Sequence, residues 1–284
     1  MCAARLLTCK SYPVNAVPPL AGAPLRIGAM ASGSVREADL EATTEAAAEY
    51  LMTIRYMHGE GQPVIAARLA ERLHVTPATV SEMVNRLTRA GLLTVDEGTR
   101  ELLLTDRGRR AAERTFRRHA LAEWLLTEVI GLGWAEADEE AHHLQHALSD
   151  RVTDRIDELL GHPPTCPHGN PLPRDGRTPD RPAGIRLSDA VPGSDVTVLR
   201  VTEEAEEDAR LLTFLEQHGV RPGRLLRVVE VAEHIGTMTL SGDGGDVTIG
   251  LVAAAKIRAL EGRADPALFH RVPERARLAA SAAR

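Results

Sequence analysis

The stretch VIAARLAERLHVTPATVSEMVNRLTRA, residues 64–90, decides the fold of the first half of this chain. Apolar residues recur every three or four positions on both sides of a short break, which predicts helices over about 64–73 and 77–90. Thr76 is a suitable N-cap and Pro77 fits the first helical position after it. Two helices joined by so short a turn predict a helix–turn–helix.

The flanking sequence extends this unit to a complete domain. Before it, residues 43–57 carry apolar side chains at helical spacing. After it, the short apolar runs 92–95 and 101–104 surround Asp96-Glu97-Gly98, which predicts a β-hairpin. Three helices followed by a hairpin predict a winged helix–turn–helix domain over residues 39–105.

The remainder of the chain predicts a mainly α protein with a small β module. Helical patterns run from Thr105 to about Ile130, over 135–148 and over 150–160, which predicts a helical domain over 106–161. Residues 162–184 are rich in proline and predict a linker or an extended strap. Short strands at 196–201, 225–231, 238–241 and 247–249, with a helix over 206–218, predict an SH3-like barrel over 185–262. Residues 1–38 and 263–284 are expected to be a disordered extension and a disordered tail.

Composition narrows the class of protein. Apolar residues make up 43% and charged residues 26%, and no apolar run approaches the roughly 18 residues of a membrane helix. The first 33 residues lack the continuous apolar core of a signal peptide, and Met30 is an alternative start. Three cysteines give no disulfide framework, so a cytoplasmic location is expected.

The second helix of the helix–turn–helix has the side chains of a DNA-reading helix. Short polar residues at its N-terminal end would lie closest to the base edges in the major groove. Arginines around it are placed to reach phosphates, which fix register without reading sequence. A carboxylate near DNA must either accept a hydrogen bond from cytosine or point away. The predicted DNA contacts are Arg68, Thr76, Ala78, Thr79, Ser81, Glu82, Arg86 and Arg89.

Charge is distributed in a way that favours DNA binding. The net charge is −6, yet seven arginines gather between Arg100 and Arg118. A local basic stripe on an acidic protein is typical of a DNA-facing surface. The stripe alone is also explained by the general preference of this chain for Arg over Lys.

The helix over residues 135–148 carries a stripe of metal-binding side chains. Asp138, His142, Gln145 and His146 fall at i, i+4, i+7 and i+8, which is one helix face. Two histidines at i, i+4 can hold one divalent ion, as in zinc peptidases. The peptidase motif needs a glutamate directly after its first histidine, and His143 stands there. The pattern therefore favours a metal-binding protein that is not an enzyme.

One helix supplies too few ligands, so further ones should come from elsewhere. His119 and Glu123 share a face of the preceding helix at i, i+4, and Glu49 stands among apolar neighbours on the first helix. Cys166 and His168, with His162, could form a second metal site. Their proline-rich surroundings favour a structured turn instead.

With these residues in view, the chain resembles the diphtheria toxin repressor family of iron- and manganese-dependent regulators, from about Thr43 to Leu260. The motifs that carry the resemblance are Glu49-Tyr50-Leu51, Thr76-Pro77, the runs 118–123 and 146–150, and the strap 166–173. The resemblance implies a primary metal site formed by Glu49, His142, Gln145 and His146. It also implies an ancillary site formed by His119, Glu123, Asp138, Glu203 and Glu206.

Departures from the family pattern affect the choice of metal. Iron-responsive members have sulfur-bearing residues where this chain has Glu49 and His142, and a glutamate is usual where it has Gln145. A ligand set of nitrogen and oxygen favours Mn²⁺, while two imidazoles also suit Fe²⁺ or Zn²⁺.

The resemblance implies a homodimer that binds a palindromic operator in double-stranded DNA when metal is bound, and that represses metal-uptake genes. Two other functions stay open at this stage. One is a winged-helix regulator of an organic effector; the other is a metalloenzyme with an accessory domain.

Overall fold

The computed structural model describes residues 44–174, 178–274 and 276 of the chain. The predicted N-terminal extension, residues 1–38, and the last residues of the predicted tail, 277–284, lie outside these. None of the described helices is long and apolar enough to cross a membrane.

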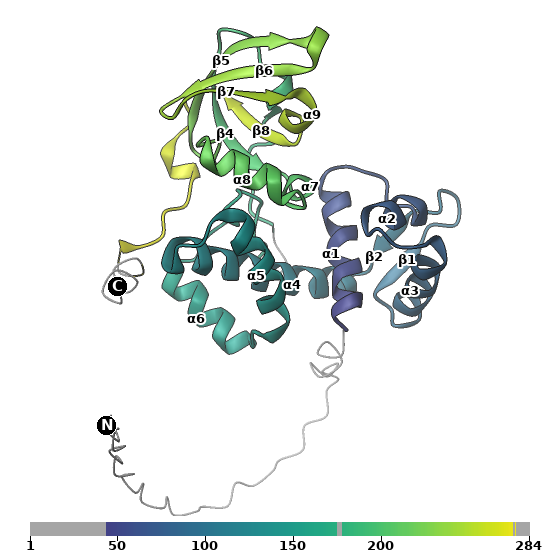
Figure 1. Ribbon diagram of the computed structural model, residues 1–284. Coiled ribbons are helices and arrows are strands. Elements are labelled where there is room, and N and C mark those ends of the chain that lie inside the picture. Colours follow the sequence, from purple (N-terminus) through teal and green to yellow (C-terminus); the bar gives the residue numbers. More distant parts are fainter. Residues whose placement is uncertain (1–43, 175–177, 275, 277–284) are drawn as a thin grey trace, which may run out of the picture. The chain divides into compact units, whose positions relative to one another are not determined.

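The N-terminal domain is a winged helix–turn–helix, as the sequence predicted (Figure 1). Thr44 and Thr76 cap the first and third helices with their hydroxyl oxygens. Leu51, Leu69 and Val80 are fully buried where the helices meet. The elements are α1 (Glu45–Gly59), α2 (Ala66–Arg72), α3 (Pro77–Arg89), β1 (Leu93–Val95) and β2 (Leu102–Leu104).

The helical domain follows the second strand of the wing. Its elements are α4 (Asp106–Leu125), a π-helical turn (Leu126–Ile130), α5 (Trp134–Ala147) and α6 (Asp150–Leu160). The sequence predicted one helix as far as Ile130; the last turn widens before Gly131, which adopts a left-handed conformation with φ of 90°. α4 contacts α1 as well as α5 and α6, so it joins the two domains.

The C-terminal module contains a six-stranded antiparallel sheet in the order β3-β8-β4-β5-β6-β7, within the part of the chain that is described. A helix of the helical domain contributes to its core, because Trp134 packs with the buried side chains of the sheet. The elements are β3 (Ile185–Arg186), β4 (Asp195–Val201), α7 (Glu203–Glu206), α8 (Ala209–Gln217), β5 (Leu225–Ala232), β6 (Thr237–Gly242), β7 (Gly245–Gly250), α9 (Leu251–Ala254) and β8 (Ile257–Glu261).

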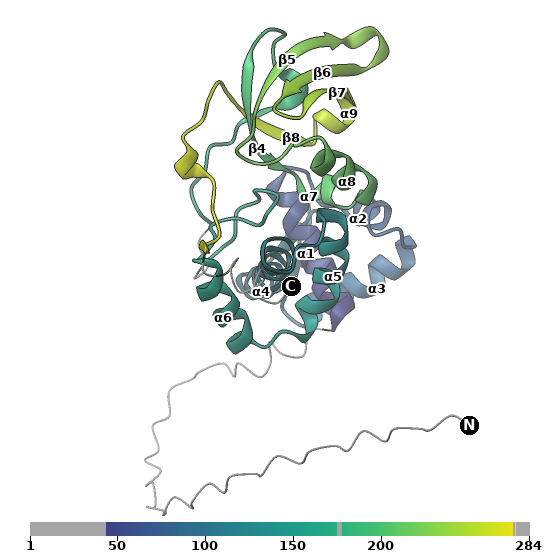
Figure 2. The same cartoon turned by 60° about the vertical axis from the view of Figure 1, so that its left-hand side comes forward.

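The segment after Gly262 differs from the expected disordered tail. Residues 263–274 include a 3-10 turn, Pro266–Leu268, and the side chain of Val272 is buried. Figures 1 and 2 both show this yellow segment running from the sheet back toward the helical domain. Apolar periodicity did not predict this, because Leu268, Phe269 and Val272 stand among charged and small residues with no clear period.

Candidate metal centres

The first candidate centre lies between α1 and α5. The carboxylate of Glu49 lies 3.9 Å from Nε2 of His142. On the same face of α5, the side-chain amide nitrogen of Gln145 lies 3.2 Å from Nδ1 of His142 and 3.2 Å from Nε2 of His146. The structure thus brings the four residues of the predicted primary site together.

Unsatisfied polar atoms at this centre fit a bound cation. Oε2 of Glu49 and Oε1 of Gln145 are buried and have no hydrogen-bond partner. Such atoms are costly unless something else coordinates them. Rotating the Gln145 amide by 180° would exchange its donor for an acceptor between the two imidazoles, since the two ends of an amide are nearly equal in shape.

Histidine chemistry at this centre also suits a metal. Burial lowers the pKa of His146, and neighbouring His142 lowers it further, against the opposite effect of Glu45 and Glu49. His146 is therefore neutral at neutral pH, which is the form that donates a lone pair to a metal. Carboxylate, amide and imidazole donors can hold a divalent transition metal.

The second candidate centre lies deeper, where α4 meets α5. Nε2 of His119 lies 3.6 Å from Glu123 and 3.3 Å from Asp138. Ligand atoms of these three residues all lie within 4.8 Å of one another. His119 and Glu123 are buried and Asp138 is partly buried, so this part of the predicted ancillary site is compact.

A turn between the helical domain and the sheet adds further donors. Nδ1 of His168 lies 3.2 Å from Glu123 and 3.2 Å from Glu206, and Sγ of Cys166 lies 3.8 Å from Glu206. Glu123, Cys166 and His168 form a second group of donor atoms within 4.8 Å of one another. The buried nitrogens of His168 and the carboxylate oxygens of Glu123 lack hydrogen-bond partners of good geometry, which again fits a cation.

The side-chain amide of Asn170 and the close approach of Gly169 hold this turn in place. Asn170 donates a hydrogen bond to the carbonyl of Val201 and another to Glu206, so the turn is tied to β4 and α7. Gly169 has φ of 94°, and a Cβ there would meet the carbonyl oxygen of Leu199 at 2.5 Å. Only glycine allows the turn to lie so close to β4.

Protonated histidines balance the buried carboxylates of the second centre. Burial alone would lower the pKa of His119, but the carboxylates of Glu123 and Asp138 raise it to about 10. Burial also acts to lower the pKa of His168, and Glu206 and Glu123 raise it well above its usual value. Glu123 itself has a pKa of about 2, because His119 and His168 outweigh its burial.

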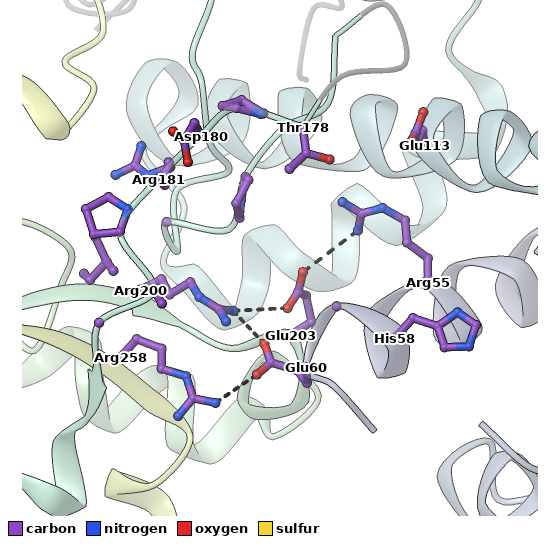
Figure 3. Close-up of a pocket in the computed structure, with 18 of the residues that line it drawn as sticks. Arg55, His58, Glu60, Glu113, Thr178, Asp180, Arg181, Arg200, Glu203 and Arg258 are labelled. Atoms are coloured by element: carbon purple, nitrogen blue, oxygen red, sulfur yellow. Dashed lines mark hydrogen bonds and ion pairs between the residues drawn. The ribbon is translucent and has the colours of Figure 1, made fainter. Parts of the chain in front are cut away.

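Glu203, predicted for the ancillary site, points elsewhere. Figure 3 shows its carboxylate between two arginines, 3.9 Å from Arg55 of α1 and 3.6 Å from Arg200 of β4. Burial and the nearby Glu206 raise the pKa of Glu203 to about 7. In this structure Glu203 therefore pairs with Arg55 and Arg200, while Glu206 faces the second centre.

Sequence reasoning assigned Cys166 and His168 to a structured turn and not to a metal site. They do form a turn, but the turn brings both side chains to Glu123. The sequence did contain one sign of a metal site, the spacing Cys-x-His, which places two metal-donor side chains two positions apart. It could not show that carboxylates about 40 positions away, on Glu123 and Glu206, would lie against them.

The predicted DNA contacts share one property. Arg68, Thr76, Ala78, Thr79, Ser81, Glu82, Arg86 and Arg89 are all exposed, so α3 presents a free face. Part of the basic stripe has a different role: Arg117 pairs with Asp154 and Asp157, and Arg118 pairs with Asp150. These two arginines fasten α4 to α6.

Comparison with known families matches three parts of the chain. Residues 42–98 match the model of the iron-dependent repressor N-terminal DNA-binding domain. Residues 105–174 match the iron-dependent repressor metal-binding and dimerisation domain. Residues 185–259 match the FeoA domain.

Individual relatives are similar over most of their length. The chain is 41% identical over 199 residues to the iron-dependent repressor IdeR of Mycobacterium leprae, which covers 67% of this chain and 85% of that protein. It is 35% identical over 218 residues to the diphtheria toxin repressor of Corynebacterium diphtheriae, covering 74% of this chain and 93% of that protein. A solved manganese-dependent transcriptional repressor in complex with manganese has a TM-score of 0.66 and 34% identity, with 76% of this chain and all of that chain covered.

Proposed function

Because the chain belongs to the family of iron-dependent and diphtheria toxin repressors, which are metal-dependent transcriptional repressors, we propose that it represses transcription when a divalent metal occupies the centre formed by Glu49, His142, Gln145 and His146. The observation that carries the proposal is the meeting of Glu49, from the DNA-binding domain, with three donors on α5 of the helical domain.

The metal would be Mn²⁺ in preference to Fe²⁺ or Zn²⁺. Oxygen and imidazole donors without sulfur make a relatively hard site. The chain's own departures from the iron-type pattern, Glu49 and His142, support this choice. A second ion would be held by His119, Glu123, Asp138, His168 and Glu206, with Cys166 as a soft donor nearby.

The proposed coupling of metal to DNA runs through α1 and α5. Glu49 of α1 and the imidazoles of His142 and His146 on α5 would share the ion, whose positive charge would attract donors on both helices. Glu49 then holds α1 against α5, which favours one arrangement of the DNA-binding domain over others. In a homodimer the two α3 helices would be held roughly 34 Å apart, one turn of DNA, and would bind a palindromic operator. A repressor acts where the DNA lies, so we place it in the cytoplasm.

The test is operator binding with and without Mn²⁺, using DNA from upstream of the chain's own operon. His146→Ala should lose metal-dependent binding while remaining a folded dimer. His143→Ala is the matched control, since His143 is exposed on the same helix. A His146→Ala protein that still needs metal and keeps its affinity would contradict the assignment of the centre.

A second variant tests the coupling itself. Glu49→Ala should weaken operator binding only when Mn²⁺ is present, because metal-free binding depends on phosphate contacts and stays weak and salt-sensitive. The four affinities of wild type and variant, with and without metal, give the coupling free energy. A coupling of zero would exclude the role of Glu49, even in a metal-dependent repressor.

A further inference from the structure

The last described residues, 263–274 and 276, lie beyond the match to the FeoA domain, which ends at residue 259. This segment follows β8, which lies between β3 and β4 in the sheet, and ends against the helical domain. It contributes nothing to the buried core of the sheet, whose members come from residues 134–259. Its contacts therefore call for a separate explanation.

Apolar side chains of this segment are buried in the helical domain. Val272 is 4% exposed and Ala276 fully buried, and both belong to one cluster with Phe116, Leu160 and Cys166. Phe116 lies on α4, Leu160 on α6, and Cys166 in the turn Cys166–His168 that approaches Glu123. The segment thus covers the apolar side of the same turn whose polar side faces the second centre.

Polar contacts fix the path of the segment. Nε2 of His270 lies 2.8 Å from the carbonyl oxygen of Leu160, and its ring packs edge-on against Trp124 at 5.4 Å between centroids. Arg181, in the linker, donates a hydrogen bond to the carbonyl of Leu268 at 2.7 Å. Phe269 and His270 also line a cavity of about 140 Å³, together with Trp134 and Pro167.

The second centre needs such a contact because its donors come from two parts of the chain. His119, Glu123 and Asp138 lie in the helical domain, whereas Glu206 lies on α7 of the C-terminal module. The linker before β3 and the packing of Trp134 against the sheet already join these parts. A further attachment reduces the arrangements that the module can adopt, so it would raise the effective concentration of Glu206 at the centre.

We propose that residues 263–274 and 276 form a C-terminal strap that packs the turn Cys166–His168 against α4 and holds Glu206 at the second metal centre. The claim that Glu206 is held at a metal centre rests on the proposed function, whereas the claim that the segment packs the turn against α4 does not. Val272 and His270 are the residues that carry it, one through burial and the other through its hydrogen bond to α6.

The first experiment measures packing in metal-free protein. In a Cys2→Ser, Cys9→Ser background, Cys166 is the only thiol, and it is 1% exposed. Its rate of reaction with a thiol reagent reports how often the turn opens. Deleting residues 263–284 should raise this rate at least tenfold, and Val272→Ser should raise it several-fold. Arg271→Ser is the matched control, because Arg271 is exposed in the same segment and should leave the rate unchanged.

The second experiment measures the metal. Mn²⁺ titration of the deletion variant should show at least tenfold weaker binding at the second centre and unchanged binding at the first. Far-UV circular dichroism and the thermal transition establish that the variants are folded, and Val272→Ser serves if the deletion does not fold. If the Cys166 thiol reacted at the same rate in all variants, the proposal that the C-terminal strap packs the turn would be wrong. A wild-type protein that binds a single equivalent of Mn²⁺ would instead contradict the second centre, so the two failures are distinct.

Discussion

At the scale of single residues, Gln145 departs most from what a metal site needs. It is fully buried, and its amide lies between two imidazoles. A neutral donor leaves Glu49 as the sole carboxylate among the four residues proposed for the first centre. The charge of that centre, and so its affinity for hard ions, depends on this one position.

We expect Gln145→Glu to tighten Mn²⁺ binding at the first centre about tenfold, because a second carboxylate adds Coulomb attraction to the ion. In the metal-free protein the new carboxylate would be buried, so the thermal transition should fall when metal is removed. Isothermal titration and melting curves, each with and without Mn²⁺, measure both effects. Unchanged affinity would show that Gln145 does not coordinate the ion.

Single residues also show where sequence reasoning stops. The stripe from Asp138 to His146 follows from helical periodicity, because the spacing fixes which side chains share a face. The approach of His168 to Glu123, 45 positions apart, does not follow, since it depends on how a proline-rich turn folds back. The same is true of Glu203, whose direction is decided by Arg55 and Arg200.

At the scale of elements, the longer helices were predicted well, but the strands β3 and β8 were not. β8 lies between β3 and β4, yet no strand was predicted there, because Ile257 and Ala259 offer only two inward side chains and alanine favours strands weakly. The predicted helix over 206–218 corresponds to α8, which begins three residues later at Ala209, while Glu206 is the last residue of the short α7. The carboxylate of Asp208 accepts hydrogen bonds from the backbone N–H groups of Arg210 and Leu211 and so sets the start of α8, which apolar periodicity alone does not locate.

Contacts between elements also join the DNA-binding domain to the C-terminal module. Glu60, directly after α1, lies 2.7 Å from Arg200 of β4 and 3.1 Å from Arg258 of β8 (Figure 3). Its side chain is 8% exposed. Removing its charge would leave two arginines without this partner in a partly buried place.

Glu60→Gln should therefore lower the free energy of unfolding by about 3 kcal/mol. Glu97→Gln, an exposed position in the wing, is the control and should change it by less than about 0.5 kcal/mol. Urea denaturation of both variants measures the difference. Similar values for the two would mean that the contact of Glu60 contributes little to holding the domains together.

At the scale of the whole molecule, the two centres differ in protonation. His146 is already neutral at neutral pH, whereas His119, with a pKa of about 10, and His168 carry protons in the metal-free protein. These imidazolium groups stabilise the metal-free fold. The part due to His119 is complete below about pH 6.5 and is lost as the pH rises through about 10.

Metal binding at the second centre must then release protons, so its affinity should rise steeply with pH. Between pH 6.5 and 8.5 we expect an increase of about tenfold to a hundredfold per pH unit, for one or two protons released. The first centre should change little above pH 7. Competition with a chromophoric chelator at several pH values measures both. A second centre whose affinity is independent of pH would contradict the protonation described for His119.

Because the two metal centres are buried to different extents, they should exchange metal with solvent at different rates. His142 is 53% exposed and Glu49 38%, whereas Glu123 and His168 are each 1% exposed. An ion at the first centre can be exchanged with solvent as fast as its bonds break, but one at the second must wait until the packed turn opens. After a brief rise in metal concentration, the first centre would lose its ion before the second. The contact between α1 and α5 would then follow the current metal concentration, while the second centre would stay occupied for some time after that concentration has fallen.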